Sequence, residues 1–264
     1  MTIHYIGLSC FLIENQAGYR ILIDPFNDAP EWILGPNFPK EFKGAPFGAN
    51  IVLMSEPDAD HAYAPGDWLL NAPKTKPNSD PFPDLNLRGT VVYEWNGDTN
   101  IAWSYTVDGV HLVHLADNAH VLEPKQLEEI GKPDILFMSP SKPDLAGKED
   151  VTTMKNIDLL KPSAVIWAHH LAPKNLPDTG NGDVLRGYFR NYFRENASTN
   201  AGYKGESSFM ELCYILENAT RLNRTYNGVV LKVPTLEITP EFLAQSAKPT
   251  SYLFASMLAS SRIE

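Results

Sequence analysis

The sequence predicts a mixed α/β fold in which sheets are covered by helices. Two patterns in the 264 residues carry this prediction. The first quarter alternates apolar and polar residues with the period of two that is typical of strands. From residue 123 onward, short apolar runs alternate with longer segments of helical spacing, as expected for helices packed on sheets. The sequence shows no repeat of fixed period and no clear linker, so we expect a single domain over residues 1–264.

The N-terminal part is expected to be built from strands. They are predicted at residues 2–8, 10–15, 19–24 and 50–54. Pro25 ends the third strand, because the residue before a proline is pushed toward an extended conformation. Residues 26–49 and 73–84 are rich in proline and other residues that disfavour regular structure, so both segments are predicted to be irregular. A helix is expected to begin at residues 65–72 between them.

The remaining elements follow the same reasoning from apolar spacing. Further strands are predicted at residues 90–95, 100–107, 110–116, 134–140 and 164–170, and helices at 123–131, 151–162, 183–196 and 206–221. The pair Asp108-Gly109 predicts a hairpin turn between two of these strands. Residues 228–243 are expected to add one or two strands and a short helix.

The acidic composition argues against two classes of partner. With 32 acidic and 22 basic residues, the net charge is −10 and the pI is about 5.2, so nucleic acids and anionic membranes would be repelled. Neither a signal peptide nor an apolar run long enough to span a membrane is recognisable. Cys10 and Cys213 lie in apolar surroundings and are expected to be buried free thiols. We therefore expect a cytoplasmic protein with a small-molecule substrate, and we leave a homo-oligomer open.

Three predicted strands end in residues that commonly bind metal ions. The first end, SEPDADH, carries Glu56, Asp58, Asp60 and His61; the second, HLADNAH, carries His114, Asp117 and His120; the third, WAHH, carries His169 and His170. Each cluster alone is weak evidence, because an aspartate after a strand often caps a helix and a lone histidine is more often structural. Three such ends in one α/β chain favour a metal site more than any single cluster does.

With these motifs in this order, the chain resembles the metallo-β-lactamase superfamily, in particular its L-ascorbate-6-phosphate lactonase-like hydrolases. The resemblance begins at IGLSCFLIE…YRILIDPF, with Gly7 and Asp24, and runs through WAHH to about residue 175. It implies a four-layer αβ/βα sandwich with a mixed, mostly antiparallel pair of sheets. The site would lie at one edge of the sandwich.

The resemblance also implies a set of metal ligands. The usual motif of the family reads Ser/Thr-His-x-His-x-Asp-His, and Asp60 and His61 match its last two positions. Asp117 matches the aspartate that bridges two metal ions in the family, and His169 matches the final histidine. These four residues correspond to the second of the two metal positions of the family.

The first metal position departs from the family pattern. Glu56 and Asp58 stand where the motif has its first two histidines, and the later histidine falls near Tyr93 or Glu94. Ala116 replaces the glycine of the family's HxGD turn. Carboxylates in place of imidazoles add negative charge around the ion, which weakens its effect on bound water and favours harder ions than Zn²⁺.

From this comparison we expect a hydrolase of a small ester, lactone or phosphorylated compound that uses one divalent ion, Zn²⁺, Mn²⁺ or Fe²⁺. The predicted ligands are Asp58, Asp60, His61, Asp117 and His169. The residues predicted to take part in catalysis are Asp60, Glu56 and Asp58, the last two as further ligands or as the base that accepts a proton. His114 and His120 are expected to orient the ligands.

Two alternatives remain open, and a third is weak. A metal-free binding or regulatory protein on the same fold would explain the lost histidines. A carboxylate-rich iron site could carry out redox chemistry, but the sequence offers no fused electron-transfer module. A serine hydrolase is not favoured, since neither Ser9 nor Ser55 has a histidine and aspartate partner that can be recognised from the sequence.

Overall fold

The structure is a computed structural model, and part of the chain is described. The described residues are 1–26, 48–57, 61, 82–94, 96–140, 151–170, 172, 183–184, 186–188, 191, 206–244, 249–255 and 257–258. The predictions for 27–47, for the helix at 65–72 and for 73–81 lie outside these residues. So do Asp58 and Asp60, and the side chain of Cys213.

The N-terminal strands form a five-stranded sheet. Its members are β1 (Thr2–Gly7), β2 (Cys10–Glu14), β3 (Arg20–Ile23), β4 (Ile51–Leu53) and β11 (Thr235–Glu237). They lie in the order β11-β1-β2-β3-β4, antiparallel except for the β3–β4 pair. All four predicted N-terminal strands are confirmed, and β2 is buried on both faces, because its residues Cys10–Ile13 are buried in succession.

The second sheet has seven strands. Its members are β5 (Arg88–Tyr93), β6 (Thr99–Val107), β7 (Val110–His114), β8 (Ile135–Met138), β9 (Ala164–Trp167), β10 (Val229–Leu231) and β12 (Thr250–Phe254). The order is β10-β12-β9-β8-β7-β6-β5. Strands β10, β12, β9, β8 and β7 are mutually parallel, whereas β6 and β5 are antiparallel to their neighbours.

The expected predominance of antiparallel pairing is therefore wrong. Five neighbouring pairs are antiparallel and five are parallel, four of the latter in the seven-stranded sheet. The physical reason is the crossover through a helix, which returns the chain to the same end of the sheet before the next strand begins. The helices between β7 and β8 and between β8 and β9 are such crossovers.

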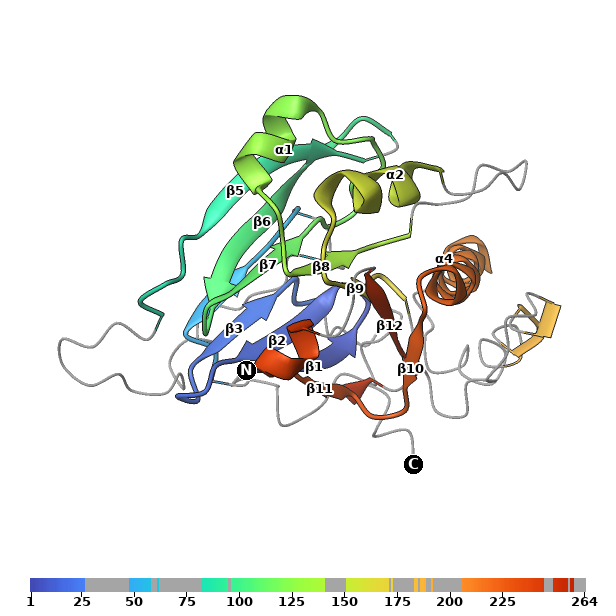
Figure 1. The fold of residues 1–264 in the computed structure, drawn as a ribbon. Coiled ribbons are helices and arrows are strands. Elements are labelled where there is room, and N and C mark those ends of the chain that lie inside the picture. The colour runs from blue at the N-terminus through green and yellow to red at the C-terminus, as the bar shows by residue number, and fades with distance from the viewer. Residues whose placement is uncertain are drawn as a thin grey trace.

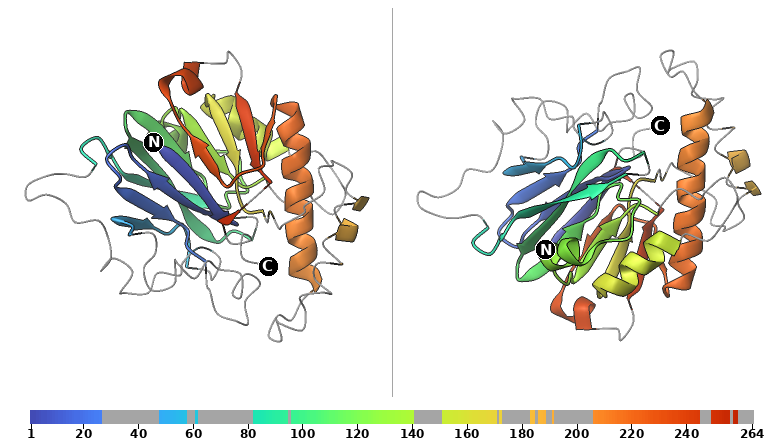
Figure 2. Two further views of the ribbon diagram at one scale, coloured as in Figure 1. Left: turned by 90° about the horizontal axis from the view of Figure 1, so that it is seen from below. Right: turned by 90° about the horizontal axis from the view of Figure 1, so that it is seen from above.

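The helices are α1 (Pro124–Ile130), α2 (Val151–Leu160), α4 (Glu206–Thr225) and α5 (Pro240–Ala244). Figure 1 shows α1 and α2 on the outer side of the seven-stranded sheet, and α4 runs beside β12 and β10 (Figure 2). In the helix predicted at 183–196, the six residues that the structure describes are helical, and the others lie outside the described residues. Among the described helices, none is long and apolar enough to cross a membrane.

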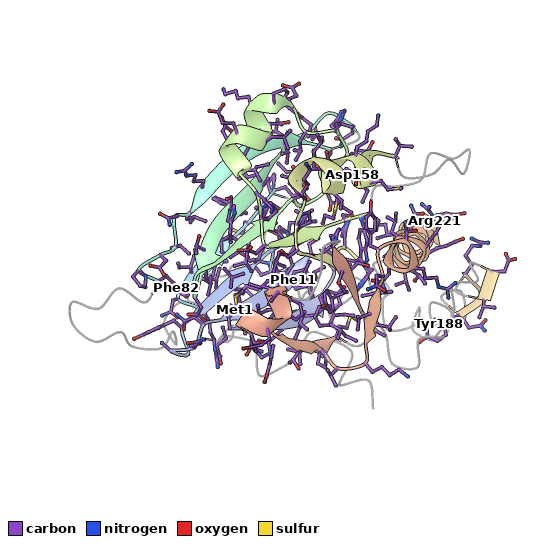
Figure 3. The ribbon with its side chains drawn as sticks, in the orientation of Figure 1. Met1, Phe11, Phe82, Asp158, Tyr188 and Arg221 are labelled. Carbon is purple, nitrogen blue, oxygen red and sulfur yellow. The ribbon has the colours of Figure 1, made fainter. Side chains whose placement is uncertain are left out.

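The core lies between the two sheets. Phe11 of β2, at the centre of Figure 3, meets Phe137 of β8 with ring centroids 4.8 Å apart, and Tyr5 of β1 stacks on Phe254 of β12 at 5.1 Å. All four positions of β8 and of β9 are buried, as expected for parallel strands covered on both faces. Cys10 lies in this core as the predicted buried free thiol. The sheets are therefore fixed relative to one another by aromatic packing.

Candidate functional site

The predicted site residues follow the carboxyl ends of strands from both sheets. Asp24 directly follows β3, and Glu56 follows β4 in the same sheet. In the other sheet, His114 is the last residue of β7, Asp117 follows it, and His169 follows β9. These ends meet at one edge of the sandwich, the edge at which α/β proteins commonly bind their ligands.

Three of the predicted metal ligands come together there. One ligand atom from each of His61, Asp117 and His169 lies within 4.8 Å of the others. His169 Nδ1 is 2.9 Å from Asp117 Oδ2, and His61 Nε2 is 4.0 Å from Asp117 Oδ1. The two imidazoles meet edge to face, with centroids 5.3 Å apart. We call these three residues the ligand cluster.

The residues of the ligand cluster are buried to different degrees. The His61 side chain is completely buried, that of His169 is 8% exposed and that of Asp117 is 16% exposed. Asp117 is therefore the most exposed of the three, while the protein surrounds His61.

Behind the ligand cluster lies a second group, which we call the Asp24 network: Asp24, Ser55, His61 and His114. The Ser55 backbone N–H and hydroxyl donate hydrogen bonds to the Asp24 carboxylate at 2.7 and 2.8 Å. His61 Nδ1 lies 2.9 Å and His114 Nε2 lies 2.8 Å from Asp24 Oδ2. Four hydrogen bonds therefore converge on one completely buried carboxylate.

This arrangement keeps Asp24 ionised. Burial by itself raises the pKa of a carboxyl group, but the neighbouring imidazoles of His61 and His114 and their hydrogen bonds outweigh it. Together they hold the pKa of Asp24 well below its usual range. A carboxylate with four donors is thus the stable form of this group in the folded protein.

Asp24 also determines the tautomer of His61. Because Nδ1 lies 2.9 Å from a carboxylate oxygen, it carries the ring proton and donates a hydrogen bond to Asp24. The lone pair of the neutral ring is then on Nε2, the atom directed toward Asp117. Hydrogen bonding of the far nitrogen to a carboxylate is the usual way in which proteins orient a metal-binding histidine.

Glu56 lies on the other side of the His61 ring. Its side chain is buried, and Oε1 is 3.0 Å from His61 Nε2. Burial, a hydrogen bond with the Glu94 side chain and the negative charges of Asp117 and Glu94 raise the pKa of Glu56 to about 9, although His61 opposes the shift. At neutral pH this carboxyl group therefore keeps its proton in the metal-free protein.

The backbone adopts an unusual conformation at three of the strand ends that build the site. Asp24 has a φ angle of 44°, Ala116 of 51° and His169 of 57°, all in the left-handed region. Residues with a Cβ atom rarely adopt this region, and each such residue costs about 1–2 kcal/mol. The surrounding contacts must offset this cost, and such strain concentrates at functional sites.

Ser55, His61 and Asp24 touch one another, but they do not form a nucleophilic triad. The Ser55 hydroxyl lies 3.1 Å from His61 Nδ1, a contact that the sequence did not reveal. Both the hydroxyl and the imidazole donate to Asp24, so no base is directed at the hydroxyl. Ser55 is also buried, which leaves the serine-hydrolase alternative without support.

The structure thus separates the predicted site residues into groups. Glu56, His61, Asp117 and His169 lie together, whereas Asp58 and Asp60 lie outside the described residues. His114 orients the site through Asp24 rather than by touching the ligand cluster. His120 is exposed and bonds through Nε2 to the backbone carbonyl of Glu94, so the expectation that it contacts and orients a described ligand is not supported.

Sequence reasoning missed the roles of Asp24 and Glu94. Asp24 was recognised only as a matching family position, and Glu94 only as the place of a missing histidine. A signal for Asp24 was present, because an aspartate that ends a buried apolar strand, before Pro25, has no evident reason to be there unless it is hydrogen-bonded.

The donors of the ligand cluster suit a divalent transition metal ion. Two imidazole nitrogens and a carboxylate, largely buried and converging within 4.8 Å, are the donor types used for Zn²⁺, Mn²⁺ and Fe²⁺. The prearranged His61 tautomer is a second feature expected of a metal-binding histidine. The residues present therefore fit the group that the fold implies.

Comparison with known proteins agrees with this fold. Residues 2–169 match the sequence family described as the beta-lactamase superfamily domain. This match spans the first nine strands and ends at His169. The chain thus belongs to the metallo-β-lactamase superfamily, whose members are typically zinc-dependent hydrolases.

Two solved structures are similar to the chain. A protein from Thermotoga maritima, described as a candidate Zn-dependent hydrolase of the metallo-beta-lactamase superfamily, matches at 18% identity and a TM-score of 0.50, covering 96% of this chain and 98% of its own. The metallo-beta-lactamase fold protein YhfI from Bacillus subtilis matches at 11% identity and a TM-score of 0.42, covering 64% of this chain and 85% of its own. No curated protein sequence matches the chain.

Proposed function

We propose that the protein is a hydrolase of a small ester, lactone or phosphorylated compound, with one divalent ion at the ligand cluster. The observation that carries the proposal is the convergence of His61, Asp117 and His169 within 4.8 Å, with His61 held by a buried carboxylate. Two of these residues are histidines, and both are buried, so the cluster is not an exposed group of acidic side chains.

The ion would be held by His61 Nε2, His169 Nδ1 and the Asp117 carboxylate, with Asp60 and Asp58 as further proposed ligands. When bound, such an ion acts as a Lewis acid that polarises a substrate oxygen and lowers the pKa of a coordinated water. We further propose that the chain belongs to the L-ascorbate-6-phosphate lactonase-like branch with an altered metal motif. Glu56 and Glu94 lie where that branch has histidines, and their side chains hydrogen-bond to one another.

Glu56 is the residue placed to hold a proton beside the cluster. Its Oε1 lies 3.0 Å from His61 Nε2, and the pKa near 9 keeps the group protonated at neutral pH in the metal-free protein. In this form it can donate a proton to a leaving oxygen as a general acid. To act as the general base that the sequence suggested, it would first have to release that proton.

The C-terminal strands support a single domain over residues 1–264. β11 completes the five-stranded sheet, and β10 and β12 extend the seven-stranded sheet. The residues beyond the family match are therefore built into the same two sheets that carry the site.

Metal content is the experiment that tests the proposed function. The full chain is purified without added metal or nickel resin, and its metals are measured by inductively coupled plasma mass spectrometry before and after reconstitution with Zn²⁺, Mn²⁺ or Fe²⁺. We expect about one equivalent of ion, as for a single site of three or four protein ligands. The variants Asp60→Ala, Asp117→Ala and His169→Ala should lose it. Lactones and phosphoesters are then screened with the loaded protein.

A matched control is available in His111, a histidine at the other end of β7. Its imidazole bonds to Ser104 and to the backbone carbonyl of Lys132, away from the cluster. His111→Gln should keep the full metal content. Absence of metal from the reconstituted wild-type protein, or equal loss in His111→Gln and His169→Ala, would overturn the single-ion hydrolase.

One observation favours a second candidate, a metal-free binding or regulatory protein. The protonated Glu56 lies 3.0 Å from His61 Nε2, so the negative charge at this position is neutralised by a proton without a cation. This candidate predicts that the wild-type protein binds no metal ion under any reconstitution condition. The same metal measurement therefore separates the two functions.

A further inference from the structure

The segment that contains His169 is hydrogen-bonded to Leu8, the residue that follows β1. The Leu8 N–H donates to the His170 carbonyl at 3.0 Å, and the His169 N–H donates to the Leu8 carbonyl at 2.9 Å. These two hydrogen bonds form an isolated antiparallel bridge between Leu8 and His170. The five-stranded sheet thus holds the segment that follows β9 of the seven-stranded sheet, next to the ligand cluster.

His169 needs such support because of its backbone conformation. Its φ angle of 57° is in the left-handed region, and Leu8, whose carbonyl accepts the hydrogen bond of the His169 N–H, has a φ of 53°. Both residues carry a Cβ atom, so both conformations are unfavourable in isolation. If the bridge were loosened, the turn would relax, and the imidazole of His169 would no longer be directed at Asp117.

Tyr5 is positioned to hold this bridge. Its hydroxyl contacts both the carbonyl oxygen of His170 and, at 2.5 Å, Nδ1 of the same residue. The arrangement is chemically complete when the tyrosine donates its proton to the carbonyl and accepts one from Nδ1–H of the neutral His170 ring. Both side chains are completely buried. His170 is therefore held at its backbone and at its ring by one hydroxyl group.

The tyrosine ring itself has little freedom to move. It stacks on Phe254 at 5.1 Å, lies 5.1 Å from Phe11 and meets the His170 ring edge to face at 4.9 Å. A register shift in the β1–β2 pairing between Tyr5 and Gly7 marks a bulge, which bends the end of β1. The hydroxyl is therefore presented to the site by a rigid part of the core.

We propose that Tyr5 is a positioning residue for the ligand cluster: through His170 and the Leu8 bridge, its hydroxyl holds the left-handed turn that directs His169 at Asp117. The inference rests on the proposed function in one respect: it assumes that the aligned ligand cluster binds a metal ion. Tyr5 touches neither the ion position nor the described ligands, so it acts through His170 alone.

The test compares Tyr5→Phe with two controls. Tyr5→Phe keeps the ring and its packing and removes only the hydroxyl. Tyr105→Phe makes the same change at another completely buried tyrosine, whose hydroxyl has no hydrogen-bond partner among the described residues. Ser251→Ala removes buried hydrogen bonds to Asn223 near the end of α4 and controls for a general loss of stability.

Two measurements on the full chain are made for each variant. The dissociation constant for Zn²⁺ is determined by competition with a chromogenic chelator. Amide hydrogen exchange at Leu8 and His169 is followed by nuclear magnetic resonance on the metal-free protein, where both amides donate to the bridge.

In Tyr5→Phe we expect the dissociation constant to rise about tenfold, as for the loss of other partners behind a metal ligand. Protection of the Leu8 and His169 amides should be lost in the same variant. Tyr105→Phe and Ser251→Ala should leave both values as in the wild type, even where Ser251→Ala lowers the melting temperature. Equal values for Tyr5→Phe and Ser251→Ala would overturn the proposal. If the wild-type protein binds no Zn²⁺, the proposed function fails, and unchanged amide protection in Tyr5→Phe would separately overturn the positioning role.

Discussion

The two sides of the His61 ring differ in what surrounds them. On the Nδ1 side, the Asp24 network gives a buried carboxylate four hydrogen-bond donors and lowers its pKa. On the Nε2 side, Glu56 is also a buried carboxyl group, yet burial, a hydrogen bond with Glu94 and the charges of Asp117 and Glu94 raise its pKa to about 9. The same functional group is ionised on one side and protonated on the other.

The difference shows that protein hydrogen bonds satisfy the Nδ1 side of His61, whereas the Nε2 side is suited to a bound cation. Asp24 has its charge balanced by protein donors, so the Asp24 network needs nothing else to be stable. The acidic groups around Nε2 lie close to one another, and burial together with their like charges keeps Glu56 protonated. A bound cation would supply the missing positive charge.

The largest expected effect comes from breaking the Asp24 network. Asp24→Asn keeps the shape of the side chain but turns an acceptor into an amide whose NH₂ group faces hydrogen-bond donors. We expect the free energy of unfolding of the metal-free protein to fall by roughly 3 kcal/mol or more, as when one partner of a buried charge network is removed. Urea denaturation measures the change. Asp158→Asn, at an exposed position of α2 labelled in Figure 3, should change it by less than about 0.5 kcal/mol. Similar losses in the two variants would contradict the comparison.

A smaller effect is expected from Glu56, in the dependence of stability on pH. Unfolded Glu56 has a pKa of about 4.5 and folded Glu56 one of about 9, so between these values the folded state keeps a proton that the unfolded state has released. The stabilisation linked to Glu56 is complete below about pH 4.5 and is lost as the pH rises toward 9. The slope is on the order of 1 kcal/mol per pH unit.

Denaturation of the metal-free protein between pH 6 and 8 measures this slope. Glu56→Gln should flatten it, since the amide does not titrate. Glu129→Gln, in the exposed pair with Lys125 on α1, should leave it unchanged. If Glu56→Gln keeps the wild-type slope, Glu56 is ionised in the folded protein and the comparison with Asp24 fails.

The smallest effect is expected at His120. Its exposed imidazole bonds only to the Glu94 backbone carbonyl among the described residues. His120→Ala should lower the free energy of unfolding by less than about 1 kcal/mol, the net value of one hydrogen bond, and leave the metal content unchanged. Chemical denaturation and metal analysis of this variant check both points. Loss of metal would show that His120 acts on the site after all.

The sequence was informative where structure depends on local pattern. The N-terminal strands were found from their alternation of apolar and polar residues, although four successive residues of β2 are buried, and α1 was found because its pattern ends at Gly131, which has a φ of 72°. Strand β12 was not expected. Its residues become a strand by pairing with β9 and β10 on both sides, and this pairing is a property of the whole sheet.

The site residues show the same division between what local pattern predicts and what depends on tertiary contacts. His61, Asp117 and His169 could be proposed from strand ends and a family motif, and the structure brings them together. The contact between Asp24 and His114 joins residues 90 positions apart, and no spacing rule links them. Nor could a pattern show that Glu56 and Glu94 would share a hydrogen bond, because the meeting of the residues that follow β4 and β5 depends on how the two sheets pack.

The last strands of the chain lie beside strands from earlier parts of the chain. β11 (Thr235–Glu237) covers the outer edge of β1, and β12 (Thr250–Phe254) covers the edge of β9. While the chain is being synthesised, both edges stay unpaired until these late residues have left the ribosome. A fragment limited to the family-matched residues 2–169 would expose the same two edges permanently. Exposed edges pair with other chains, so the nascent protein passes through a stage in which aggregation competes with folding.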